Sequence, residues 1–289
     1  MKVKKQWIVI FLIPGTLLFI FVYALSLGTL LATSFTEWRI GNNLKFIGLQ
    51  NYIEMFRSET FRAAAFNTVI WILLQSTVHV LIGVIFALII SRKTRYSKFA
   101  RTVFMIPNII SSAALGMLYL CILNSKFGLV NSAVRLFGNE NFSQNWFMDP
   151  KTAFFSVTMT WLPFAATVAL LVTAEMTAID TSVYEAAEID GATEFQKSIY
   201  ITLPLVKNAI GTGTIISATS MLQKLDLILM TTNGGPGTTT MNLPLLIYET
   251  SMRSNDYSLA SAQGVILILI GMVSIAVINR IYGIGKKEE

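Results

Sequence analysis

Six long apolar stretches constrain the fold of this chain more than any other feature of the sequence. They lie near residues 7–33, 67–90, 102–123, 152–174, 208–230 and 260–282. Each has about the 20 residues that an α-helix needs to cross the hydrocarbon core of a bilayer. Only 13% of the residues are charged, whereas an ordinary soluble domain has about a quarter. The sequence therefore predicts one all-α integral membrane domain, residues 1–289, with six transmembrane helices.

Basic residues predict how these helices are oriented. Six spans place both termini on one side of the membrane, together with the loops 91–101 and 175–207. These segments hold thirteen Lys and Arg residues, against eight in the longer loops 34–66, 124–151 and 231–259. Because Lys and Arg are enriched in cytoplasmic loops, both termini are predicted to be cytoplasmic. The net charge of +6 is explained by this topology, so no nucleic-acid partner is needed.

The first apolar stretch and the single cysteine each have a simple interpretation. The first apolar stretch is too long for the core of a signal peptide and five more follow, so we expect a retained first span. The single cysteine, Cys121, excludes a disulfide within the chain. We expect it to be a small packing residue.

The loop 175–207 carries helix signals rather than the composition of a flexible connection. Ser182 and Glu185 have the spacing of a capping box, and Thr193 with Gln196 repeats that spacing. Between them Gly191 follows Asp190, and glycine readily takes the positive φ at which many helices end. The sequence predicts two short helices that meet at Gly191, with Pro204 in the first turn of the helix that follows.

The charge of this loop distinguishes two interpretations. An amphipathic loop that lies on its own membrane would usually carry Lys and Arg on its polar face. This loop has only two lysines, Lys197 and Lys207. It has six carboxylates, which are those of Glu175, Asp180, Glu185, Glu188, Asp190 and Glu194. The small pair Ala186-Ala187 is suited to close insertion into a groove. We therefore expect the loop to dock a separate protein.

The spacing E-A-A-x3-G-x9-I-x-L-P resembles the cytoplasmic signature of permease subunits of bacterial ATP-binding-cassette (ABC) importers. The resemblance implies that the loop couples the permease to a partner ATPase, with Glu185 meeting a basic residue of the ATPase groove. The residues implied in coupling are Glu185, Ala186, Ala187, Asp190, Gly191, Ile201, Leu203 and Pro204.

Four further motifs narrow the resemblance. They are Phe46–Tyr52 (F-x-G-L-x-N-Y), Asn67-Thr68, Gly128–Asn131 and Thr232–Gly237 (T-N-G-G-P-G). In this order they are similar to elements of maltose-type carbohydrate permeases. In that family the motif at Thr232–Gly237 distinguishes the first permease subunit from the second, unlike one. The chain departs from the pattern at Asp180, where many members have proline, and at Leu225, where many have phenylalanine.

Candidate substrate residues are sought on the two spans that flank the coupling loop, because the resembled family builds its sugar site there. Ionisable groups inside spans are expensive and often functional. The candidates are Trp161, Ser217, Met221, Lys224 and Asp226. His79 is expected to be a hydrogen-bonded packing residue. Lys224 either extends to the outer interface, which favours a neutral oligosaccharide, or lines a water-filled cavity, which favours an acidic or phosphorylated sugar.

These observations predict a sugar-importing permease rather than an enzyme. The chain has no G-x4-G-K-[ST] motif, and Gly283–Lys286 lacks its spacing, so ATP and Mg²⁺ are expected on the partner ATPase pair and no cofactor on this chain. The other expected partners are a second unlike permease, an external solute-binding protein and membrane lipid. A glycerophosphate ester or another non-sugar cargo is an alternative. A secondary transporter is a weaker one, because the sequence shows no internal repeat.

Overall fold

The computed structural model describes residues 5–38, 44–91 and 95–283. Helices make up most of the described chain, and the one sheet within the described part is an antiparallel pair of two-residue strands. The predicted all-α class is therefore confirmed. The chain divides into two compact units, residues 1–62 with 246–269 and residues 63–245 with 270–289, which are described separately. Arg92 and Lys93 of the basic loop, and residues 284–286 of Gly283–Lys286, lie outside the described residues.

The first unit begins with a helix that is almost entirely apolar. Its elements are α1 (Lys5–Phe19), a π-helical turn (Ile20–Ala24), α2 (Leu25–Ser34), β1 (Thr36–Glu37), β2 (Lys45–Phe46) and α3 (Gln50–Arg57). It also holds the start of α4 (Glu59–Leu74), the end of α16 (Leu243–Tyr248), the π-helical turn Glu249–Arg253 and the first half of α17 (Tyr257–Tyr282). Asn51 of the F-x-G-L-x-N-Y motif is buried and donates its amide to the carbonyls of Ser34 and Thr36, which ties α3 to the end of α2.

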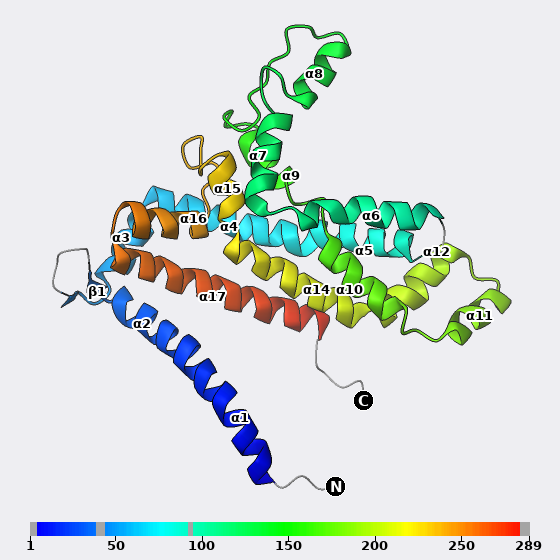
Figure 1. Ribbon diagram of the computed structural model, residues 1–289, viewed down its shortest axis with the longest axis horizontal. Helices are drawn as coiled ribbons and strands as arrows, with labels where there is room; N and C mark the ends of the chain where they lie inside the picture. Colours follow the sequence, from blue (N-terminus) through cyan, green and yellow to red (C-terminus); the bar gives the residue numbers. More distant parts are fainter. Residues whose placement is uncertain (1–4, 39–43, 92–94, 284–289) are drawn as a thin grey trace. The chain divides into compact units, whose positions relative to one another are not determined.

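The second unit holds most of the helices, which Figure 1 labels. After α4 come a π-helical turn (Gln75–His79), α5 (Val80–Ile90), α6 (Arg95–Ile109), α7 (Ser112–Ile122), α8 (Leu129–Leu136), α9 (Ala153–Met159), α10 (Ala166–Met176) and α11 (Thr181–Ile189). There follow α12 (Glu194–Lys197), a π-helical turn (Ser198–Thr202), α13 (Leu203–Leu205), α14 (Lys207–Ser220), a 3₁₀ turn (Met221–Gln223) and α15 (Asp226–Thr231).

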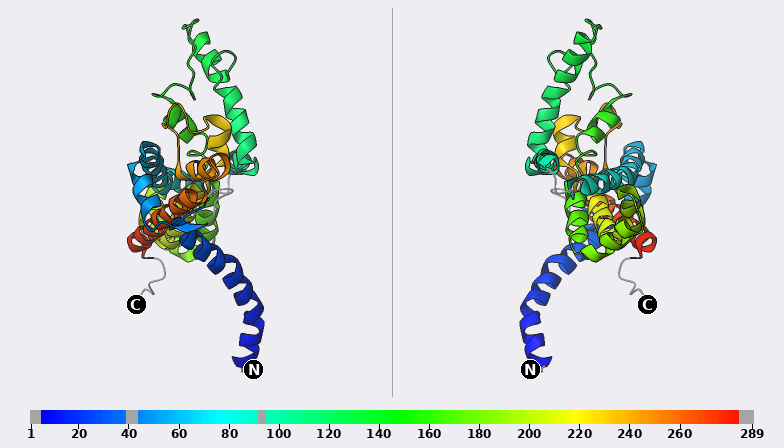
Figure 2. Two further views of the ribbon diagram at one scale, coloured as in Figure 1. Left: turned by 90° about the vertical axis from the view of Figure 1, so that its left-hand side faces the viewer. Right: turned by 90° about the vertical axis from the view of Figure 1, so that its right-hand side faces the viewer.

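Small residues let the central helices of this unit approach closely. Helix α10 packs between α5 and α14, and Figures 1 and 2 show the three running side by side. Val168 of α10 is fully buried; a Cβ at Gly83 of α5 would come within 2.7 Å of its Cβ, and one at Gly213 of α14 within 3.5 Å of its methyls. Helices in a bilayer gain little from the hydrophobic effect between them and rely on such close packing.

Three of the six predicted spans are continuous helices and three are interrupted. Residues 11–34, 59–90 and 257–282 form helices long and apolar enough to cross a membrane. The predicted third span is broken into α6 and α7, which meet at 104°. The predicted fourth is broken between α9 and α10, where Pro163 lacks a backbone N–H, and the fifth between α14 and α15. Counting each bent helix pair as one span gives up to six; these pairs are α6 with α7, α10 with α11 (77°), and Glu194–Leu205 with Lys207–Gln223 (69°).

Two of the sequence motifs meet in the second unit. Asn67 of α4 is buried and donates its amide to the carbonyls of Thr238, Thr239 and Met241, at 3.2, 3.1 and 2.8 Å. Its neighbour Thr68 accepts a hydrogen bond from the backbone N–H of Leu243. Asn67-Thr68 therefore holds the chain that follows the Asn-Gly-Gly-Pro turn. Buried carbonyls need such partners, so these motifs fix loop geometry.

Candidate functional site

The loop 175–207 folds into two short helices that meet at Gly191, as the sequence predicts. Helix α11 ends in a Schellman motif: the N–H of Ala192 donates to the carbonyl of Ala187, and that of Gly191 to the carbonyl of Glu188. Gly191 has φ +77°, which the motif requires and which other L-residues rarely adopt. We call α11 and the continuous helix Glu194–Leu205 the coupling elbow.

The start of each elbow helix is capped by a side chain, in one case not the predicted one. Thr193 and Gln196 form the predicted capping box at α12. The predicted box of Ser182 with Glu185 is wrong, because α11 begins earlier: Asp180 is the N-cap and accepts from the Ser182 N–H at 2.9 Å. That hydrogen bond holds the pKa of Asp180 below its usual value. Asp180 thus does locally what a proline at a helix start does, which is to fix where the helix begins.

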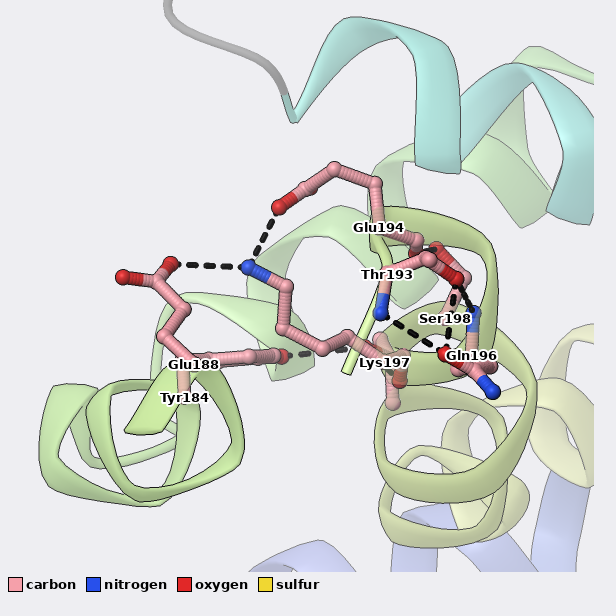
Figure 3. Close-up of polar contacts among 8 residues, drawn as sticks. Tyr184, Glu188, Thr193, Glu194, Gln196, Lys197 and Ser198 are labelled. Atoms are coloured by element: carbon pink, nitrogen blue, oxygen red, sulfur yellow. Dashed lines mark hydrogen bonds and ion pairs between the residues drawn. The ribbon is translucent and has the colours of Figure 1, made fainter. Parts of the chain in front are cut away.

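Lys197 joins the two helices from inside the elbow. Its ammonium forms ion pairs with Glu188 of α11, at 2.8 Å, and with Glu194 of α12 (Figure 3). The Lys197 side chain is 8% exposed, whereas the two carboxylates are 63% and 71% exposed. Hydrogen bonds to Glu188 and then Glu194 raise the pKa of Lys197 above its usual value. Tyr184 adds a second link, at 3.1 Å from the hydroxyl of Thr202.

The outer face of the elbow presents apolar side chains beside carboxylates. Ile189, Phe195 and Tyr200 are 88%, 74% and 76% exposed. Of the residues implied in coupling, Glu185, Ala186, Asp190, Gly191 and Pro204 are exposed, Ile201 and Leu203 are half-buried, and Ala187 is buried. A hollow of ≈ 250 Å³ at the bend is lined by Asp190, Gly191, Ala192, Gln196, Tyr200 and Ile201. Exposed apolar side chains beside charged ones are a feature of surfaces that contact another protein or a membrane.

A second candidate site is a cavity of ≈ 220 Å³ in the same unit. The residues lining it include those at the breaks of all three interrupted spans: Ile110 and Ser112 of the third, Thr160, Trp161 and Phe164 of the fourth, and Lys224 of the fifth. Irregular backbone inside a membrane is tolerated where it lines a cavity, because water or a ligand can satisfy its polar groups. Convergence of three breaks therefore indicates a site for a polar ligand.

Lys224 lies in this cavity rather than only near a helix end. Its ammonium is over the ring of Trp161, 5.5 Å from the ring centroid. Trp161 packs edge-on against Trp71, whose ring stacks on Phe154 and whose Nε1 donates to Thr158 Oγ1 at 2.8 Å. The backbone carbonyl of Lys224 accepts from Asn242 at 2.7 Å. Contacts outside the cavity therefore fix both residues: Asn242 holds the backbone of Lys224, and Trp71 packs against the ring of Trp161.

The other candidate residues are divided between the cavity and its surroundings. Ser217 lines the cavity. Met221 is buried outside the lining, and Asp226 is exposed outside it. His79 is hydrogen-bonded, as expected, with Nδ1 2.8 Å from the Leu162 carbonyl, and it also lines the cavity. Polar lining residues that the sequence analysis did not single out are Gln75, Asn108, Ser112, Thr160, Thr167 and Ser220.

Comparison with known proteins places the chain in a family. Residues 79–285 match the model of the binding-protein-dependent transport system inner membrane component, and the chain belongs to this family. It is 29% identical to the sulfoquinovosyl glycerol transport system permease protein SmoG of Agrobacterium fabrum, over 94% of this chain and 89% of that protein. It is 30% identical to the trehalose/maltose transport system permease protein MalF of Thermococcus litoralis, over 78% and 76%.

A solved structure has the same fold. A chain of a bacterial alginate ABC transporter, in complex with an alginate pentasaccharide-bound periplasmic protein, superposes with a TM-score of 0.81 over 97% of both chains at 21% identity. These findings confirm that the chain is a multi-pass membrane permease subunit of a carbohydrate-type ABC importer, not its ATPase. The family's name also assigns it to the inner membrane.

Proposed function

We propose that this chain forms half of the translocation pathway for a saccharide in an ATP-driven importer, and that its coupling elbow docks the ATPase. The observation that carries the proposal is the elbow itself. Its two helices are capped, joined at Gly191 and clamped by Lys197, yet they leave Ile189 and Phe195 uncovered. A rigid body with an uncovered apolar face is suited to transmit force from a partner.

The cavity supports a saccharide as the cargo. Its lining combines hydroxyl and amide groups with the ring of Phe164, and sugars are recognised by hydrogen bonds together with apolar ring faces. Relatives are named for trehalose/maltose and for sulfoquinovosyl glycerol. Its volume of ≈ 220 Å³ is below the roughly 300–1,000 Å³ of complete ligand pockets, as expected for a site completed by another subunit.

The assembly that we propose has a second, unlike permease subunit, two nucleotide-binding subunits that hold ATP and Mg²⁺, and an external solute-binding protein. The T-N-G-G-P-G motif supports the assignment as the first of the two permeases. The whole chain acts as one transmembrane domain with both termini in the cytoplasm, which the basic residues of the described loop at Arg95, Lys98 and Arg101 support.

Reconstitution tests this proposal. The two permeases, the ATPase and the solute-binding protein are assembled in proteoliposomes, and uptake of radiolabelled saccharides is measured with ATP on the elbow side. Uptake that requires ATP hydrolysis, and that is lost in Glu185→Lys without loss of the chain from the membrane, is the expected result. Uptake driven by a proton gradient in the absence of ATP would contradict the proposal and favour a secondary transporter.

A further inference from the structure

We propose that the cavity selects a saccharide with a single negative charge, such as a carboxylate or sulfonate, and that Lys224 is the residue that contacts this group. The inference rests on the proposed function and specifies the charge of its cargo. It replaces the neutral oligosaccharide that a lysine at the outer interface would favour, because Lys224 lines the cavity.

Lys224 is the only Lys, Arg, Asp or Glu among the residues that line the cavity. The other lining residues in the described chain carry amides, hydroxyls, one imidazole and apolar groups. Among the described residues no carboxylate forms an ion pair with its ammonium. Asp226, two residues along, is exposed and outside the lining. The Asp226 carboxylate acts on the Lys224 ammonium through space but forms no ion pair with it. A half-buried cation without a direct carboxylate contact is well compensated by an anion of the ligand.

The position of Lys224 is fixed by neighbours rather than by its own flexible chain. Trp161 places a ring face under the ammonium, and a cation over an aromatic ring is stabilised while its remaining N–H groups stay free to donate. Because the ammonium covers this face, Trp161 acts here as a positioning residue for Lys224. Phe164, which also lines the cavity, is left to contact an apolar face of the sugar.

Neutral groups around Lys224 are suited to the rest of a sugar. Gln75 lines the cavity, is 4% exposed, and its Oε1 has no hydrogen-bond partner. A buried acceptor of this kind costs free energy unless it is satisfied, and a sugar hydroxyl can satisfy it. One lysine among neutral hydrogen-bonding groups supplies a single positive charge, which balances a monoanion better than a phosphate ester with nearly two negative charges.

Two of the three cargoes in the test differ only in charge. The complete importer in proteoliposomes is given a disaccharide that carries one galacturonate, its carboxyl-reduced neutral counterpart, or glycerol 3-phosphate, and ATP-dependent uptake is compared for wild type, Lys224→Met, Lys224→Arg and the exposed control Lys207→Met. Because every variant is supplied with the same solute-binding protein, the preference of that protein cancels when variants are compared. The size of the importer complex on gel filtration confirms assembly.

We expect Lys224→Met to lower uptake of the monoanionic disaccharide roughly ten- to a hundredfold, the loss for one charge-assisted hydrogen bond. Uptake of the neutral counterpart should change less than about twofold, and Lys224→Arg should restore uptake of the anion. Equal losses for both saccharides, or unchanged uptake of the anion in Lys224→Met, would overturn the inference. ATP-driven uptake of the neutral saccharide would still leave the proposed function standing. Preference for glycerol 3-phosphate would overturn the saccharide assignment as well.

Discussion

Substitution at Gly191 separates the geometry of the coupling elbow from its surface chemistry. A Cβ built at Gly191 meets no atom within 4 Å, so a larger residue costs backbone strain and nothing else within the elbow. At φ +77°, an L-residue such as alanine costs about 1–2 kcal/mol. A β-branched residue is expected near the upper end of the roughly 1–3 kcal/mol seen at strained positions. Asparagine tolerates this region and should cost least.

These energies convert directly into an expected loss of docking. If α11 must end at Gly191 to dock, about 1.4 kcal/mol corresponds to a tenfold weaker complex. We therefore expect the dissociation constant between the permease pair in nanodiscs and the purified ATPase to rise roughly 5- to 30-fold for Gly191→Ala and up to about 150-fold for Gly191→Val. Gly191→Asn should stay within about threefold of wild type.

Gly48 provides a matched control for this series. It has φ +62° and also has nothing within 4 Å of a built Cβ, but it lies in the first unit, in a loop predicted to be external. Gly48→Val carries the same backbone strain and should leave the dissociation constant of the ATPase unchanged. Wild-type affinity in Gly191→Val, or an equal loss of affinity in Gly48→Val, would refute the reasoning that the bend at Gly191 sets the docking geometry.

Three further predictions follow from other parts of the chain. Lys197→Met should lower the number of saccharides imported per ATP hydrolysed, because the two elbow helices lose their internal link, whereas the exposed Lys207→Met should not. Uptake and phosphate release measured together give this ratio, and equal ratios in the two variants would contradict the role of Lys197. Asn67→Leu should destabilise the importer by about 1–3 kcal/mol by leaving buried carbonyls without a donor, seen as a lower unfolding temperature, and an unchanged temperature would contradict that role. In a cysteine-free background, Asn139→Cys should react with a membrane-impermeant thiol reagent on intact cells and Phe195→Cys should not; the reverse pattern would overturn the orientation.

The sequence predicted the coupling elbow well because its determinants are local. The turn at Gly191 and the box of Thr193 with Gln196 depend on residues three or four apart, which periodicity and spacing capture. The cap of α11 was assigned to Ser182 rather than Asp180 because both are good caps, and sequence alone does not decide between candidates two residues apart. The role of Lys197 was missed because its burial is produced by two helices folding onto one another.

The cavity was harder to predict, because it depends on which spans break and where. Pro163 predicts the break in the fourth span. Mean hydropathy does not reveal the breaks in the third and fifth stretches, because a few polar residues hardly change it. The sequence signals for these two breaks were Pro107-Asn108 and the run from Gln223 to Asp226. Cys121, expected to pack, is exposed on α7.

Polar lining residues such as Gln75 and Thr160 are ordinary single residues in the sequence. A hydroxyl or amide in an apolar stretch usually bonds back to its own helix, so no one of them indicates a site. Only when three-dimensional packing brings them to the same cavity does a site become visible. The identity of the cargo is therefore the part of the function that the sequence predicted least.

Cross-linking from the elbow tests the central claim most directly, namely that this surface docks the ATPase. A photoreactive amino acid is placed at Ile189, which is 88% exposed, and for comparison at Leu136 of α8, which is 87% exposed. The importer is irradiated in membranes and adducts are identified by mass spectrometry. We predict an adduct between position 189 and the nucleotide-binding subunit, changed in yield by ATP, and none from position 136. Adducts of position 189 with lipid alone, or equal ATPase adducts from both positions, would contradict the account.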